Sequence, residues 1–536
     1  MELHHHPEPV NADGLSYGPG SPERDLLKST LAEMESVVTD IPSIINGERI
    51  YTGRKGKQAN PWNYHGQPVA EYHEVDGSTV TEKAIPGALG ARKVWANMPF
   101  RDRAAIYKRA ALLVESPKYR WKLMAATMIG QGKTCGQAEG DCITEVIDTL
   151  NFHVYFCAQL NQQQPPKQFA SSSSRLDYRP LEGFLLAVRR LISRPWERKL
   201  PSRPRFCVMW FCGNHRQWRF FPTTSSTRSW RKPGCPRELF SSYPSLIRQR
   251  WLSLPSPAAI LLGCTIRLFR CSKVSLCSYW RQHAHLQESP PVVGESGGKN
   301  FHLVHNSCKD DVDWLASAAV RSAYEFRGQK CNALSRLYVP RSMWEQGDLK
   351  KALLREATAT MSSTSITPWG PWCNKRLFNV YGGKTDGSRG FFAQPAIFIA
   401  SDGDSDSELM TTELFGPLFA VQIYDDSSPT GFEKVCELID KTSEYGLAGS
   451  VFARDRMAVR VADEKLRDSV GMFCINDKST GAIIGAHPFG GARSSGTNDK
   501  ANSVNVLRNL HRDNERAEKV YAYFKQLSFL FVWIIA

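Results

Sequence analysis

The chain has 536 residues, 42% of them hydrophobic, which is enough to bury the cores of two or three domains. Its formal net charge of +15 would ordinarily indicate nucleic acid or an anionic membrane as a partner. The charge is uneven, however: residues 189–290 hold 19 Lys and Arg against three Glu, and the remainder holds 49 basic and 50 acidic residues. The overall charge therefore predicts neither partner.

Neither end of the chain carries a clear targeting signal. Residues 1–20 are rich in proline and glycine, lack the pattern of a mitochondrial presequence or secretory signal, and are expected to be disordered. The final LSFLFVWIIA is apolar but too short to span a bilayer. The eight cysteines outside 189–290 show no paired spacing, which favours a reducing compartment. We expect a soluble protein.

Residues 21–188 are predicted to contain helices, a hairpin and a strand, with 79–160 mainly helical. Ser21 is an N-cap candidate for the first helix, and Asn46-Gly47 between isoleucines predicts a hairpin. Apolar residues recur at three- and four-residue intervals between 79 and 160, as is typical of amphipathic helices. The run GFLLAV, which ends at Val188, predicts a buried strand.

Regular patterning stops after Val188 and returns at Pro291. Between these points Pro, Ser and Arg interrupt every periodic segment, six of the 14 Trp and six of the 14 Cys are gathered, and Asp is absent. From Pro291 a strand, a glycine turn and a strand are followed by a helix, and strands and helices then alternate to about Arg508. This alternation predicts an α/β architecture.

Cys331 and Glu295 are the first candidates for chemistry. Cys331 lies between a predicted helix and a strand, and the adjacent Lys330 is expected to lower the pKa of its thiol and so favour the nucleophilic thiolate. Glu295 ends a predicted strand before Ser-Gly-Gly, where flexible backbone can expose a carboxylate to a cleft. The alternatives are a small core cysteine and an ordinary loop carboxylate.

Four motifs in order, GESGGKN, GQKC, TTELFGP and HPFGGARSSGTND, resemble the aldehyde dehydrogenase superfamily. The resemblance is closest to its 1-pyrroline-5-carboxylate dehydrogenases and covers about 15–188 and 291–507. It implies an α/β fold with a Rossmann-type NAD-binding domain and an α/β catalytic domain. It also implies that the substrate is a small aldehyde, glutamate γ-semialdehyde, which is oxidised to glutamate in proline degradation with NAD as the cofactor.

The resemblance implies roles for individual residues. Cys331 would attack the aldehyde carbon, and Glu295 would activate the water that hydrolyses the resulting thioester. Glu413 and Phe415 match the positions that hold the ribose and ring of the nicotinamide.

Five further residues are expected near the substrate. The backbone N–H groups of an anchor loop with Gly481 and Ala482 would bind its carboxylate. Lys330 and Asn332, which flank the nucleophile, would contribute, although the family usually has serine where Asn332 stands. Glu139 matches a family carboxylate near the substrate channel, with a solvated helix position as the alternative. No metal site is expected.

Residues 189–290 lack three parts that the family implies: an asparagine that donates to the oxyanion, a strand ending in Trp-Lys-Pro-Ser, and a Gly-Ser-Thr turn. Over 209–216, joining the last base of each codon to the first two of the next gives Val-Val-Leu and then permits Trp-Lys-Pro-Ser. The same offset permits Asn-Phe-Thr-Ala-Met at 191–196 and Phe-Lys-Ser at 271–274. We therefore predict that 189–290 is a frameshifted translation, which leaves the NAD-binding domain damaged.

Six segments follow from these observations. They are a disordered start (1–20), the first part of the NAD-binding domain (21–188), the aberrant segment (189–290), the catalytic domain (291–480), the anchor loop with the return to the NAD-binding domain (481–507), and an atypical tail (508–536).

Two alternatives to an active dehydrogenase are open. One is an inactive product of a frameshifted or mis-spliced gene. The other is a zinc or nucleic-acid module inserted at 189–290, with Cys207, Cys212, His215 and Cys235 as conceivable zinc ligands, although their spacing matches no standard zinc pattern.

Partners and compartment follow the resemblance. Beyond the small-molecule aldehyde, neither nucleic acid nor a membrane is expected as a partner. The family implies a homodimer, but the residues after Val506 depart from its C-terminal segment, which puts that dimer in question. Eukaryotic relatives work in the mitochondrial matrix, whereas the absence of a visible presequence leaves the cytoplasm as the alternative.

Overall fold

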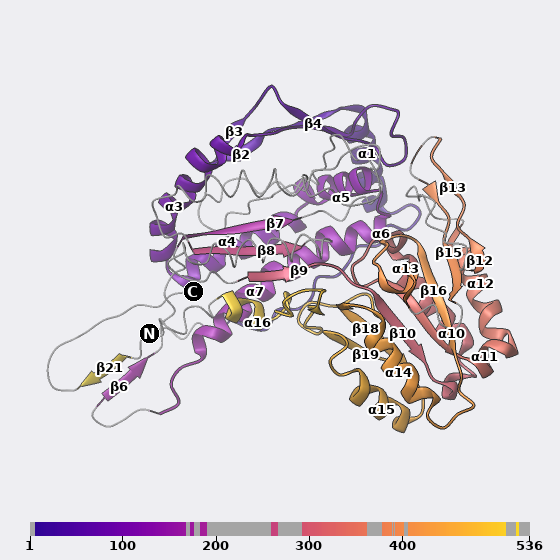
Figure 1. Cartoon of the computed structure of the whole chain (residues 1–536). Helices are drawn as coiled ribbons and strands as arrows, with labels where there is room; N and C mark the ends of the chain where they lie inside the picture. Colours follow the sequence, from indigo (N-terminus) through magenta and orange to yellow (C-terminus); the bar gives the residue numbers. More distant parts are fainter. Residues whose placement is uncertain are drawn as a thin grey trace.

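The computed structural model describes most of the chain outside 190–291. The residues described are 6–167, 172–175, 183–189, 259–265, 292–361, 378–388, 390, 392–400, 406–510 and 521–524. Figure 1 shows two main bodies, one built mainly from the N-terminal helices and the other around a large sheet. The predicted α/β architecture is confirmed.

The first body is mainly helical, as expected. The side chain of Ser21 accepts a hydrogen bond from the backbone N–H of Arg24 and so caps the first helix. Buried residues such as Met124 and Ile143 fill the core between these helices. The helices are α1 (Pro22–Ser36), α2 (Gly77–Thr79), α3 (Ile85–Asn97), α4 (Phe100–Glu115), α5 (Pro117–Gln131), α6 (Cys135–Ala138) and α7 (Glu145–Gln162).

Short strands cover one side of this body. The predicted hairpin is confirmed, because Asn46 and Gly47 both have positive φ angles, 53° and 85°, as a tight two-residue turn requires. A second small sheet has the order β1-β5-β4. The strands are β1 (Thr39–Ile41), β2 (Ser43–Ile45), β3 (Glu48–Ile50), β4 (Lys55–Gln58) and β5 (Ala70–His73).

A three-stranded parallel sheet lies beside the N-terminal helices (Figure 1). Its order is β7 (Gly183–Arg189), β8 (Ala259–Thr265) and β9 (Val292–Glu295). The expectation that no regular element lies within 189–290 is wrong at β8, because the apolar run AILLGC can pair as a central strand. The rest of that segment, with its zinc and frameshift hypotheses, lies outside the described residues.

The second body is built around a seven-stranded sheet of order β12-β15-β16-β11-β10-β18-β19, parallel except for β12. All five residues of β10 and of β18 are buried, as expected for central strands covered on both faces. The strands are β10 (Asn300–Val304), β11 (Leu334–Pro340), β12 (Phe378–Gly382), β15 (Ala396–Ala400), β16 (Leu418–Tyr424), β18 (Ala448–Phe452) and β19 (Met472–Ile475).

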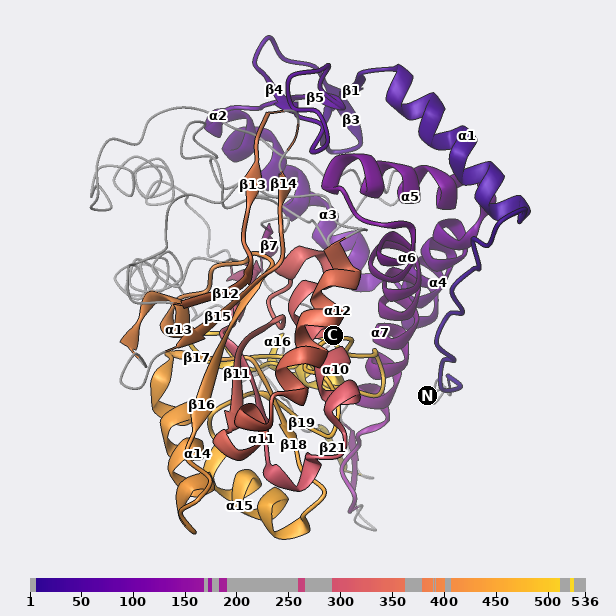
Figure 2. The same ribbon diagram turned by 90° about the vertical axis from the view of Figure 1, so that its right-hand side faces the viewer.

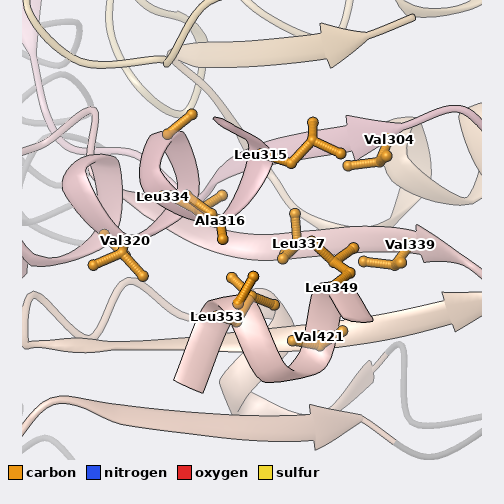
Figure 3. Packing of buried hydrophobic residues seen from close by; sticks show 14 of the residues in the cluster. Val304, Leu315, Ala316, Val320, Leu334, Leu337, Val339, Leu349, Leu353 and Val421 are labelled. Carbon is orange, nitrogen blue, oxygen red and sulfur yellow. The ribbon is translucent and has the colours of Figure 1, made fainter. Parts of the chain in front are cut away.

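Helices cover both faces of the large sheet. On one face α10 (Val312–Tyr324), α11 (Arg341–Gln346) and α12 (Asp348–Met361) bury a core that Figure 3 shows closely. On the other face lie α14 (Gly431–Thr442) and α15 (Arg456–Leu466), and Figure 2 shows the two helix groups separated by the strands. No helix in the described part of the chain is long and apolar enough to cross a bilayer.

The start of the chain differs from expectation. Residues 6–20 are largely extended and are held by two buried carboxylates rather than left disordered. Asp148 accepts hydrogen bonds from Asn11 and from the backbone N–H of Ala12, at 2.8 and 2.7 Å. Glu139 accepts from the backbone N–H of Leu15 at 3.0 Å. These hydrogen bonds pair the backbone N–H groups of Ala12 and Leu15, which the composition alone would predict to bond to solvent.

The far end of the described chain returns to the first body. Helix α16 (Val504–Leu510) packs against α7 and β9. Beyond it, β21 (Tyr521–Phe524) pairs antiparallel with β6 (Ser172–Arg175), and this ribbon stands away from the body in Figure 1.

Leu353 provides a test of the core between α12 and the sheet. Its side chain is 1% exposed and packs in the cluster of Figure 3, so Leu353→Ala is expected to lower the free energy of unfolding by about 2–5 kcal/mol. Leu112, which is 65% exposed on α4, supplies the control, and Leu112→Ala should cost less than about 0.5–1 kcal/mol. Urea denaturation followed by circular dichroism measures both, and equal losses would contradict this packing.

Candidate active site

The candidate site lies where the two sheets meet. Parallel strand β9 ends at Glu295, residues 296–299 cross to the second body, and β10 begins at Asn300. The carboxyl ends of parallel strands are where α/β proteins place ligand sites. Glu295 therefore lies at the carboxyl end of a parallel strand. Only four residues separate it from β10, an interior strand of the larger sheet.

The loop before Cys331 reverses the chain with an unusual backbone. Phe326, Arg327 and Gly328 all have positive φ angles, of 46°, 58° and 67°. A Cβ at Gly328 would lie 2.1 Å from the carbonyl oxygen of Gly416, so a larger residue has no room there. This left-handed turn joins α10 to β11 and places Cys331 between them, as predicted.

Asn300 holds the nucleophile loop against the sheet. Its Nδ2 donates to the carbonyl oxygens of Cys331 and Ala333, at 2.8 and 2.7 Å. Its Oδ1 accepts from the backbone N–H of Ala448 at 3.0 Å. One buried amide thus joins the loop to the strands on either side of β10. Sequence analysis did not single out this residue, because an asparagine in a strand carries no signal of its own.

Burial dominates the electrostatics of Cys331. It raises the pKa of the thiol to about 12, and the nearby charges of Glu295 and Glu413 act in the same direction. The expectation that Lys330 lowers the pKa of Cys331 is wrong. The Lys330 ammonium lies 2.7 Å from Glu325 and 3.4 Å from Asp141, so its charge is paired with these carboxylates. The resting thiol is therefore protonated.

Glu295 is a carboxyl group with the properties of a general base near neutral pH. Burial, with a contribution from the charge of Asp499, raises its pKa to about 8, against the opposing effects of the Gly491 N–H and the Lys500 ammonium. Its strand end forms a bridge to Gly496. Residues 490–500 therefore surround Glu295, and all of them except Lys500 belong to the HPFGGARSSGTND motif.

Glu413 and Phe415 follow α13 (Glu408–Thr411) and face the glycines after Glu295. Glu413 Oε1 accepts a hydrogen bond from the backbone N–H of Gly298 at 3.0 Å. A Cβ at Gly297 would lie 2.7 Å from Glu413 Oε2, so this approach requires glycine. The carboxylate is an acceptor suited to ribose hydroxyls, and the nicotinamide end of NAD fits these residues.

A cavity of about 20 Å³ adjoins Glu413 and Phe415 and has room for one water molecule. Glu413, Phe415 and Lys299 contribute to its lining. Lys299 is buried, which together with the charge of Arg336 lowers the pKa of its ammonium to about 7. Sequence analysis did not select Lys299, because a lysine beside two glycines is ordinarily read as exposed.

The anchor loop lies beside the nucleophile. Ala482 packs in the same apolar cluster as Cys331. Gly481 has a φ angle of 85°, and the Lys478 ammonium donates to the carbonyl of Thr480 at 2.7 Å. Cys331 and Ala482 thus pack against one cluster, and the binding of a substrate carboxylate by the N–H groups of Gly481 and Ala482 stays a prediction.

Glu139 has its polar partners in the first body. It is 5% exposed, forms an ion pair with Arg120, and accepts a hydrogen bond from the Tyr17 hydroxyl at 2.6 Å. The alternative of a solvated helix position is therefore wrong. These contacts fasten the extended start of the chain, so a role for Glu139 beside the substrate stays a prediction.

Asn332 lies next to the nucleophile and is buried, and its backbone carbonyl accepts a hydrogen bond from Ser479 at 3.1 Å. Within the described residues, no group of three or more His, Cys, Asp or Glu side chains is gathered as a metal site would require.

Comparison with known proteins gives consistent matches. Residues 51–189 and 280–512 match the model of the aldehyde dehydrogenase family. The chain is 36% identical to a probable delta-1-pyrroline-5-carboxylate dehydrogenase of Schizosaccharomyces pombe over 92% of each protein. It is 37% identical to the delta-1-pyrroline-5-carboxylate dehydrogenase of Agaricus bisporus, over 94% of this chain and 93% of that one.

Solved structures agree with these relatives. The crystal structure of the Delta-pyrroline-5-carboxylate dehydrogenase from Mycobacterium tuberculosis bound with NAD superposes with a TM-score of 0.77, at 28% identity and over 99% of both chains. The gap in the family match, 190–279, falls within the segment that sequence analysis set apart.

The pH dependence of ester hydrolysis tests Glu295. Below pH 8 its carboxyl is protonated and cannot accept a proton from water. The deacylation step of 4-nitrophenyl acetate hydrolysis, measured as turnover after the burst that acylates Cys331, is therefore expected to rise as the pH increases through about 8 and then to level off. Glu295→Gln should remove the rise and slow turnover by about 10²-fold or more.

Glu437 provides the matched control for this experiment. It is half-exposed and pairs with Lys465, 3.0 Å away on α15, so Glu437→Gln should keep both the rate and the pH profile. A Glu295→Gln variant that still shows the rise near pH 8 would assign the base to another group.

Proposed function

The chain belongs to the aldehyde dehydrogenase family, and we propose that it oxidises L-glutamate γ-semialdehyde, the open form of 1-pyrroline-5-carboxylate, to L-glutamate with NAD. The names of its relatives support this substrate, and one solved relative is described as bound with NAD. The observation that carries the proposal is that Cys331 and Ala482 both pack against the buried cluster of Leu447, Ala448 and Met472, which supports a nucleophile close to a loop suited to a carboxylate.

The reaction begins at Cys331. The thiol proton passes to solvent, and the resulting thiolate attacks the aldehyde carbon to give the oxyanion of a thiohemiacetal. NAD, when bound, supplies the acceptor for the hydride that leaves this carbon. The product on Cys331 is then a thioester.

Glu295 acts in the second half of the reaction. Its carboxylate takes a proton from water as the water attacks the thioester carbon, and the bond to sulfur breaks. L-Glutamate leaves, and the thiol is regenerated. Loss of solvent raises the pKa of both groups, so that their protonated forms predominate at neutral pH.

Two further groups position the reactants. Glu413, fixed by the N–H of Gly298, would hold the ribose next to the nicotinamide. The N–H groups of Gly481 and Ala482 would bind the carboxylate at the far end of the substrate.

The compartment proposed is the mitochondrial matrix. Relatives from Emericella nidulans, Bos taurus and Homo sapiens, 35–36% identical, carry the word mitochondrial in their names. The family's homodimer is also proposed, and sedimentation of the purified chain measures it.

The activity test is NADH formation at 340 nm with 1-pyrroline-5-carboxylate. Cys331→Ser is expected to lower turnover by at least about 10²-fold, because the hydroxyl is a far weaker nucleophile than the thiolate. Cys135→Ser, at the half-buried start of α6, is the control and should retain activity. A Cys331→Ser variant with full activity would exclude this nucleophile, and a folded wild-type chain without activity would favour the inactive alternative.

We also propose that the coding frame is shifted within 189–290. The absence of the family pattern from 190–279 and the concentration of basic residues there support this. The relatives are named as dehydrogenases, which does not favour the alternative that the gene encodes an inactive protein.

Sequencing the transcript across codons 185–295 tests the frame. We expect the transcript to differ by one base at each end of the segment. The restored frame would then encode the asparagine that donates to the oxyanion, the strand that ends in Trp-Lys-Pro-Ser, and the Gly-Ser-Thr turn. A transcript that encodes the sequence as written would contradict the shift. The chain in the restored frame then serves as the matched comparison for NADH formation.

A further inference from the structure

Ser479 connects the nucleophile loop to the anchor loop through one buried hydroxyl. Its side chain is fully buried, and its Oγ donates to the backbone carbonyl of Asn332 at 3.1 Å. The hydroxyl of Ser322, on α10, lies 3.0 Å away. Ser479 has one proton to donate, and Nε2 of His302 also lies 3.2 Å from its Oγ; in the arrangement in which the proton goes to Asn332, Oγ accepts from Ser322.

His302 fixes the backbone of the same residue. Its Nε2 accepts the backbone N–H of Ser479 at 3.2 Å, and its ring is buried within β10. Burial lowers the pKa of this imidazole to about 3, so the ring is neutral and Nε2 is free to accept. The backbone N–H of Ser479 thus bonds to His302 on β10, and its hydroxyl bonds to Asn332 in the nucleophile loop.

These contacts lie between the two groups that the substrate must span. Asn332 directly follows Cys331, and Gly481 follows Ser479 by two residues. A substrate that reacts at Cys331 while its carboxylate lies on the anchor loop must match the distance between them. The contacts join two backbone groups, the Asn332 carbonyl and the Ser479 N–H, to the buried side chains of Ser479, Ser322 and His302.

We propose that Ser479 is a positioning residue that fixes the separation between Cys331 and the anchor loop, and thereby sets the chain length of the aldehyde acid accepted. This inference rests on the proposed function, since it takes the anchor loop as the carboxylate site. Ser479 itself touches no reacting atom, and His302 and Ser322 act through it.

The experiment measures ligand protection of Cys331 in the full chain and needs neither NAD nor turnover. Alkylation of Cys331 by iodoacetamide is followed by mass spectrometry in the presence of succinate, glutarate or adipate, dicarboxylates of four, five and six carbons. In the wild-type chain glutarate is expected to protect best, because its length matches the five-carbon substrate.

Ser479→Ala is expected to weaken protection by glutarate about tenfold and to reduce its advantage over succinate and adipate, with the alkylation rate in the absence of acid unchanged within about twofold. Ser469→Ala is the matched control, because Ser469 is also buried but donates to Leu466 in its own turn, at 2.7 Å. This control should alter neither the protection nor the length preference.

The outcomes separate the two proposals. If no acid protects the wild-type chain, the anchor loop does not bind carboxylates and the proposed function fails together with this inference. If the wild type is protected and Ser479→Ala keeps the same constants and preference, only the role of Ser479 is overturned. Should Ser479→Ala not fold, Ser322→Ala, which removes the donor to Ser479, is expected to shift the preference in the same direction, and an unchanged preference would refute the inference.

Discussion

The side-chain amide of Asn300 is the interaction on which the geometry of the candidate site depends. Its two N–H groups and its oxygen are all used, in bonds to Cys331, Ala333 and Ala448. An amide buried in a central strand is stable only when these groups are paired, and each bond here also satisfies a backbone group of a neighbouring segment. The position of the nucleophile is therefore tied to the register of β10 between β11 and β18, and not to the loop alone.

Burial around this amide sets the protonation of the whole site. The pKa values of Cys331 and Glu295 are raised and that of Lys299 is lowered, in every case chiefly by loss of solvent. All three pKa shifts have the same effect, which is to favour the uncharged form of the group. The site without ligands thus stores its protons on the thiol and the carboxyl, and Glu295 is the group whose pKa of about 8 allows it to act as a base near neutrality.

Patterns that depend on local chemistry were predictable, and those that depend on distant partners were not. The cap at Ser21, the Asn46-Gly47 turn and the place of Cys331 between helix and strand are short-range features. The effect of Lys330 on the pKa of the Cys331 thiol was predicted wrongly. The Lys330 ammonium is paired with Asp141, which lies 189 residues away in sequence. Order in residues 6–20 was missed for the same reason, since Asp148 and Glu139 come from later helices.

The two halves of the site depend differently on residues 189–290. The buried residues of the cores on both faces of the large sheet lie between 301 and 466, and the described hydrogen bonds of Asn300 run to Cys331, Ala333 and Ala448, which also lie outside that segment. Glu295 is different, because it pairs with Thr265 at the end of β8, which lies inside the segment. Displacement of β8 would therefore leave a formed nucleophile loop beside a misplaced base. An altered frame thus affects thioester hydrolysis, cofactor binding and, through the missing oxyanion asparagine, the attack of Cys331 on the aldehyde, while the described hydrogen bonds that hold the nucleophile loop come from outside the segment.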